Sequence, residues 1–135
     1  AKLLLKDVDL DLAYVLPIKE RKDEYKEVIF SKVPPQAKQK VDPLILDEVV
    51  SIGKLRQTLY RQSTLQRGWV NAVIQKPRKY FVIENTSPGT PVFDQSGKWL
   101  GVVVYKMVGG RPSEIVTLPA SDVLEIAQQV RTRTQ

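Results

Sequence analysis

The side chains that could do chemistry in this chain are hydroxyls, carboxylates and cations, because its 135 residues include neither His nor Cys. Without His the chain lacks the usual general base at neutral pH and the commonest metal ligand. Without Cys it has no thiolate nucleophile, disulfide or Cys-ligated zinc site. These residues alone therefore cannot form a Ser-His-Asp triad or a Cys-His pair. We also expect no cofactor, since Gly109 and Gly110 lack the Lys-Ser/Thr pair of a phosphate-binding loop.

Three carboxylates stand at alternate positions early in the sequence: Asp7, Asp9 and Asp11. On a strand they would project to one side, where they could bind a cation. The same pattern is also explained if these residues lie on an exposed hairpin edge, where charged side chains prevent aggregation. We favour the edge explanation and predict no metal site.

Basic residues dominate the middle of the chain, which has no acidic residue between Val49 and Ile83. With interleaved aromatic residues this segment could bind nucleic acid or another polyanion. In a strand, however, cations and rings that alternate in sequence point to opposite faces, and Trp69 is expected to anchor the core. Specific nucleic-acid binding is therefore the less favoured interpretation. The candidate cations are Lys54, Arg56, Arg61, Arg67, Lys76, Arg78 and Lys79.

The elements that must position these residues are mostly short strands. Hydrophobic residues make up 42% of the chain, which is enough to form a core, and the formal net charge is +6. No apolar run is long enough to span a membrane, and the sequence has no signal-peptide pattern. Apolar alternation predicts an all-β fold with one helix, in which Ser121 caps a face formed by Val123, Ile126, Ala127 and Val130. The predicted strands are 2–5, 10–16, 28–33, 49–52, 69–74, 80–83, 92–93, 99–104 and 115–118.

A proline-rich polar stretch, 34–43, is predicted to be a linker. It separates a front piece, 1–33, from a larger unit, 44–135. Three candidate strands are marginal for an independent sheet, so the front piece needs another partner.

Several stretches, in order, resemble the trypsin-like serine peptidases of the HtrA (DegP) type. KDVDLDLAYV (6–15) is similar to the family's strand with the triad aspartate, and LDEVVSIG (46–53) to the strand that opens its second barrel. SPGTPVFDQSGKWLGVV (87–103) resembles the nucleophile turn and the hairpin that follows it. GWVNAVI (68–74) and TLPASDV (117–123) resemble a later strand and the entry to the final helix.

The resemblance places Asp11 at the triad-aspartate position. Aligned without a gap, Pro88 takes the place of the nucleophilic serine and Gly89 that of the glycine after it. Proline has neither a hydroxyl nor the N–H that would contribute to an oxyanion hole. If Pro88 is instead an insertion, Ser87 becomes the nucleophile. Asp11 also fits the solvent face of an alternating strand.

The family's histidine would lie before Ala1, so the resemblance implies a fragment with an incomplete first barrel and a complete second barrel from Leu44 to Leu118. It implies a degenerate peptidase domain that binds or regulates another protein. The alternatives are an active serine endopeptidase whose histidine lies in a missing N-terminal segment, and a basic barrel that binds polyanions. Expected partners are a protein or peptide, the missing segment, or a second copy. Relatives favour a periplasmic or secreted location.

Overall fold

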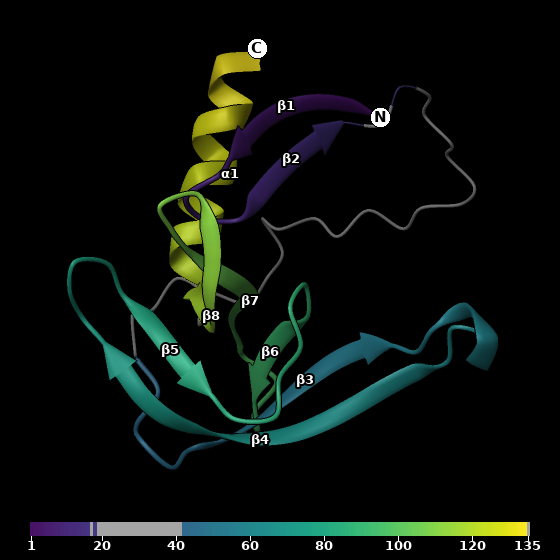
Figure 1. Cartoon of the computed structure of the whole chain (residues 1–135), viewed down its shortest axis with the longest axis vertical. Coiled ribbons are helices and arrows are strands. Elements are labelled where there is room, and N and C mark those ends of the chain that lie inside the picture. The colour runs from purple at the N-terminus through teal and green to yellow at the C-terminus, as the bar shows by residue number, and fades with distance from the viewer. Residues whose placement is uncertain (17, 19–41, 135) are drawn as a thin grey trace.

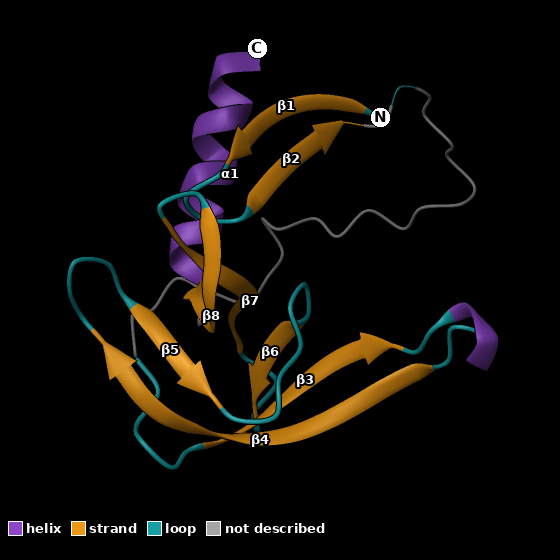
Figure 2. Cartoon of the chain, in the orientation of Figure 1, coloured by secondary structure: helices purple, strands orange, loops and turns teal. Residues whose placement is uncertain are grey.

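The computed structural model describes residues 1–16, 18 and 42–134. This part of the chain is mostly β-strand, with one α-helix at its end (Figures 1 and 2). The elements are β1 (Lys2–Asp7), β2 (Leu12–Leu16), β3 (Glu48–Lys54), η3 (Gln57–Leu59), β4 (Ser63–Ile74), β5 (Tyr80–Ile83), β6 (Pro91–Asp94), β7 (Trp99–Val108), β8 (Arg111–Pro119) and α1 (Ala120–Thr134). The predicted strand 28–33 and most of the predicted linker, 34–43, lie outside the described residues.

The six strands from β3 to β8 close into an antiparallel barrel. Their order around the barrel is β3-β4-β5-β8-β7-β6, and β6 pairs with β3 to complete the ring. Closure leaves the central parts of these strands without a free edge. The expected fold class is confirmed: a complete barrel, a separate small sheet before it and a helix after it.

Three strands extend beyond the segments that their hydrophobic patterns predict. β4 begins at Ser63 instead of residue 69, β7 continues to Val108, and β8 starts at Arg111. In these extensions the strands pair as ribbons although many of their side chains are exposed. A hydrophobic pattern detects the buried part of a strand and misses such extensions. At the end of the β7–β8 ribbon, Gly109 and Gly110 supply the two positive φ angles of a tight hairpin.

The barrel interior is filled by apolar side chains that alternate along the strands. Each of these buried side chains stabilises the fold by about 1.5–3 kcal/mol relative to an exposed one. The cluster contains Val49, Val70, Phe81, Ile83, Val92, Leu100 and Val103.

Gly101 on β7 stands where the adjacent strand leaves no room for a side chain. A Cβ at this position would overlap the carbonyl oxygen of Leu118 on β8. Gly68 on β4 has the same relation to the carbonyl oxygen of Glu84. Both positions therefore require glycine for space, not for an unusual φ angle.

A second apolar cluster attaches the β1–β2 hairpin and α1 to the barrel. Leu10, from the turn between β1 and β2, is only 6% exposed and packs with Tyr80, Val104, Val116 and Leu118. Val123 and Ile126 of α1 pack against the same cluster, which confirms the predicted apolar face of the helix. Figure 1 shows α1 lying alongside the hairpin.

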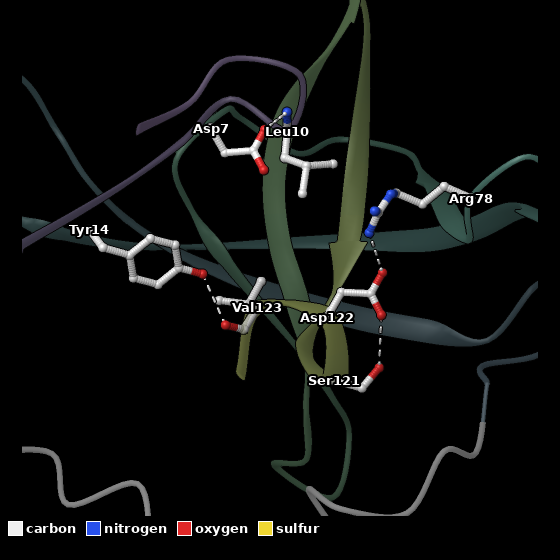
Figure 3. Close-up of polar contacts among 7 residues, drawn as sticks. All are labelled: Asp7, Leu10, Tyr14, Arg78, Ser121, Asp122 and Val123. Atoms are coloured by element: carbon white, nitrogen blue, oxygen red, sulfur yellow. Dashed lines mark hydrogen bonds and ion pairs between the residues drawn. The ribbon is translucent and has the colours of Figure 1, made fainter. Parts of the chain in front are cut away.

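Polar contacts fix the same junction (Figure 3). The Tyr14 hydroxyl donates to the Val123 carbonyl at 2.9 Å, and Arg78 contacts the Asp122 carboxylate at 3.2 Å. Burial, followed by the charge on Asp7, raises the pKa of Tyr14 above 10.0. The hairpin is thus held to the helix as well as to the barrel.

The expected capping role of Ser121 is wrong. α1 begins at Ala120, so Ser121 lies within the first turn, and its hydroxyl donates to Asp122 at 3.4 Å (Figure 3). No helix in the described ranges is long and apolar enough to cross a membrane.

We predict that Gly101→Ala lowers the free energy of unfolding by about 2 kcal/mol or more, because the new methyl group must displace β8. Urea denaturation followed by circular dichroism measures the change. Gly53→Ala is the matched control, since its Cβ would make contacts of 3.4 Å with the Thr64 and Thr90 methyl groups. Equal stability of the two variants would contradict the close approach of β7 and β8.

Candidate functional site

The segment that the sequence resemblance aligned with a nucleophile turn is a tight turn from Ser87 to Thr90. The Thr90 N–H donates to the Ser87 carbonyl at 3.3 Å, and the Thr90 hydroxyl donates to the same oxygen at 2.6 Å. Pro88 occupies the second position, while Gly89 occupies the third with a φ of 82°. Proline followed by a residue with positive φ is typical of a type II turn, so this sequence suits its conformation well.

This turn is attached to the edge of β7 by main-chain hydrogen bonds. The Gly89 N–H donates to the Val103 carbonyl at 2.7 Å, and the Val103 N–H donates to the Thr90 carbonyl at 3.0 Å. A Cβ on Gly53 of β3 would lie 3.4 Å from the Thr90 methyl group, so the turn also lies close to β3. The turn therefore extends the pairing of β6 with β7.

Ser87 is exposed, and within the described part of the chain its hydroxyl makes no hydrogen bond. A serine nucleophile needs a base in contact with its hydroxyl. The turn brings no such group to Ser87.

Asp11 does not lie on a strand, as the sequence pattern predicted. It is in the turn between β1 and β2, with a φ of 54°, and β2 begins at the next residue. Its carboxylate accepts a hydrogen bond from the Tyr105 N–H at 3.1 Å. Aspartate tolerates this left-handed conformation better than most residues do.

Asp11 and the 87–90 turn bind neighbouring points on one edge of β7. Val103 and Tyr105 are two residues apart, or about 7 Å along a strand, and their N–H groups point to the same side. The structure therefore brings Asp11 close to the 87–90 turn, the two places that the resemblance pairs as triad aspartate and nucleophile. Asp11 binds the β7 main chain through its carboxylate, and the turn binds it through the Gly89 N–H and the Thr90 carbonyl.

The alternating carboxylates do not form one face. Asp7 ends β1 and accepts the Leu10 N–H at 3.0 Å, whereas Asp9 and Asp11 belong to the turn. The three carboxylates do not share one face of a strand because the chain reverses direction between Asp7 and Leu12. In the described ranges no group of three or more His, Cys, Asp or Glu residues could hold a metal ion.

Three of the seven candidate cations are paired with acids from outside their own segment. Arg67 pairs with Glu48 and lies 5.7 Å from the centre of the Trp69 ring. Arg78 contacts Asp122 at 3.2 Å, and Lys79 contacts Asp42 at 2.7 Å. Lys76 lies in the loop before β5, and the other three surround the free end of the β3–β4 hairpin: Lys54, Arg56 and Arg61.

The seven cations therefore do not form one basic face. The aromatic residues also separate, because Tyr80 and Phe81 are buried while Trp69 is 39% exposed on the outer side of β4. The expectation that Trp69 anchors the core is wrong.

Sequence patterns did not reveal a depression of about 390 Å³ that has Asp42, Asp47, Glu48 and Asp94 in its lining. These carboxylates have structural partners: Lys79, the Leu44 N–H, Arg67 and the turn after β6, respectively. Burial alone would raise the pKa of Asp94, but hydrogen bonds from Ser96 and Lys98 outweigh it and lower the pKa below 3.8. A lowered pKa keeps the Asp94 carboxylate ionised at neutral pH, so it is not poised as a general acid.

Comparison with known proteins gives limited information. No family model matches the sequence, and no curated protein matches it. Among solved structures, the chain is similar to the MamO protease domain from Magnetospirillum magneticum in its apo form, with 12% sequence identity and a TM-score of 0.44. The match covers 63% of this chain and 49% of that chain, so this chain spans about half of that domain.

We predict that Asp11→Ala destabilises the protein by about 1 kcal/mol, because it removes the acceptor of the Tyr105 N–H and places alanine at a positive φ. Asp11→Asn keeps an acceptor oxygen and tolerates this φ, so its melting temperature should stay near that of the wild type. Thermal unfolding measures both variants. Asp11→Asn as unstable as Asp11→Ala would refute the role of the hydrogen bond.

We also predict that Asp94 makes the free energy of unfolding depend on pH in the acid range. Because its pKa is lower in the folded protein, its contribution is fully present above about pH 4 and is lost as the pH falls through the folded value. Asp94→Asn should therefore lose stability at pH 6 and show a smaller decline between pH 5 and about pH 2. Urea midpoints across this range test the sign, and parallel curves for the two proteins would contradict it.

Proposed function

We propose that this chain is a trypsin-like domain of the HtrA type that has lost peptidase activity and binds or regulates another protein. The observation that supports the proposal is the tight 87–90 turn, which is closed by the bond from the Thr90 N–H to the Ser87 carbonyl and has Pro88 inside it. Pro88, at the nucleophile position, brings no hydroxyl and no N–H. Position 88 therefore supplies neither a nucleophile nor the oxyanion donor that the family takes from the N–H of its serine.

The remaining triad positions support the same proposal. The sequence contains no His to act as the base. Asp11 accepts the Tyr105 N–H, which gives its carboxylate a structural role where the family uses the aspartate to orient a histidine. Activity from Ser87 would require both a base from another segment and a different arrangement of the turn.

A binding role is supported by the small sheet. In the described ranges β1 and β2 pair only with each other, and Leu3, Val15 and Leu16 are 55%, 58% and 52% exposed. An apolar hairpin with open edges suits pairing with a strand from a protein or peptide partner. A second copy of the chain is one candidate for the source of that strand. The resemblance favours a periplasmic or secreted setting.

We predict that a fluorophosphonate probe forms no adduct with this protein and that neither casein nor a small ester is hydrolysed. Such probes modify only an activated serine, and no described residue activates Ser87. Intact-mass spectrometry, with trypsin as the positive control, measures the adduct. Pro88→Ser should also stay unmodified, because it restores a hydroxyl without supplying a base.

The contrary result would be an adduct that maps to Ser87 and disappears in Ser87→Ala. It would establish the active-peptidase alternative, with Pro88 as an insertion in a working turn. Hydrolysis that persists in Ser87→Ala and co-purifies with the protein would contradict the expected inactivity without assigning it to Ser87.

A further inference from the structure

The free end of the β3–β4 hairpin projects away from the barrel (Figure 1). β6 pairs with β3 only as far as Ser51, and β3 and β4 then continue as a two-stranded ribbon that ends in η3. We call residues 52–65 the hairpin tip. This segment is far longer than the two-residue connection needed to join neighbouring strands.

Main-chain hydrogen bonds give the hairpin tip a defined conformation. The Leu55 N–H donates to the Gln62 carbonyl at 2.9 Å, and the Tyr60 N–H donates to the Gln57 carbonyl at 2.9 Å. Tyr60 and Arg61 adopt φ angles of 56° and 51°, which residues with a Cβ rarely do. None of the η3 residues is buried, so the tip's hydrogen bonds order a surface that does not pack on its own barrel.

Apolar side chains cover this projection. Tyr60 is 87% exposed, Leu65 72% and Leu59 54%. Ile52 and Leu65 face each other across the ribbon, so they lie on one side of it. Contiguous exposed apolar residues of this kind mark a surface that contacts a protein or a membrane.

All the charged residues of the hairpin tip are basic. Lys54, Arg56 and Arg61 are exposed, and within the described residues none of them forms an ion pair. Because Val49 to Ile83 contains no acidic residue, the tip itself offers them no counter-charge. Its partner is therefore expected to be anionic as well as apolar.

We propose that the hairpin tip docks on an anionic lipid bilayer. Its leucines and Tyr60 would enter the interfacial region, where aromatic and aliphatic side chains gain from burial. The three cations would remain among the headgroup phosphates. Nucleic acid fits less well, because its phosphate surface offers nothing to aliphatic side chains and the tip has only one aromatic ring. The inference does not depend on whether the 87–90 turn is catalytic.

Co-sedimentation with vesicles tests the proposal. The wild type should bind vesicles of phosphatidylcholine mixed with phosphatidylglycerol at least about tenfold more tightly than vesicles of phosphatidylcholine alone. The variant Lys54→Gln/Arg56→Gln/Arg61→Gln should lose more than about tenfold, because each cation near an anionic leaflet contributes about fivefold. Leu59→Ser/Tyr60→Ser should lose about tenfold or more through reduced apolar burial.

Matched control variants carry the same kinds of substitution at exposed positions outside the hairpin tip. Lys2→Gln/Arg111→Gln/Arg133→Gln removes the same charge, and Leu44→Ser/Val108→Ser removes exposed apolar side chains. Both should bind within about twofold of the wild type, and circular dichroism confirms that every variant is folded.

Three results would overturn the proposal. The first is no binding to anionic vesicles at about 0.1 M salt. The second is equal losses in the tip variants and their controls. The third is full binding by Leu59→Ser/Tyr60→Ser together with equally tight binding of the wild type to a single-stranded oligonucleotide, which would indicate a general polyanion site.

Discussion

The hydrogen bonding of one strand edge organises this molecule. β7 has ten residues but its neighbour β6 has four, so β6 pairs with only the first part of β7. Main-chain groups on the rest of that edge need other partners, because unpaired buried groups are costly. The 87–90 turn binds Val103, and the Asp11 carboxylate binds Tyr105. The unequal strand lengths thus explain why two distant segments meet on β7.

The same requirement bears on the proposed loss of peptidase activity. An oxyanion hole needs N–H groups that are ordered yet unpaired, and a triad aspartate needs a free acceptor for histidine. Here Pro88 has no N–H to offer, and an Asp11 oxygen already accepts a hydrogen bond from β7. Pro88 then costs the turn nothing, since it fixes the φ angle of the second position of a type II turn and has no N–H to leave unpaired. The 87–90 turn is therefore suited to pairing with the part of the β7 edge that β6 leaves unpaired.

Local patterns in the sequence were enough to predict the barrel and the apolar face of α1, because the spacing of apolar residues reports which side of an element is buried. They did not predict contacts that depend on distant partners. Arg78 and Lys79 looked like free cations because Asp122 and Asp42 lie 44 and 37 residues away. Asp11 looked like a strand residue because alternating carboxylates continue through a turn whose position Leu10 sets by packing in the second apolar cluster.

Pairing also accounts for the shape of the hairpin tip. Barrel closure needs only the part of β3 that contacts both neighbours, residues 49–51. Beyond it, Ile52 and Leu65 add no buried contact to either apolar cluster, and the tip's main-chain hydrogen bonds are satisfied within the ribbon. Exposed apolar residues in an ordered, acid-free projection give the folded monomer little stability of their own. The physical reason for this composition must therefore lie in what the projection meets outside the barrel.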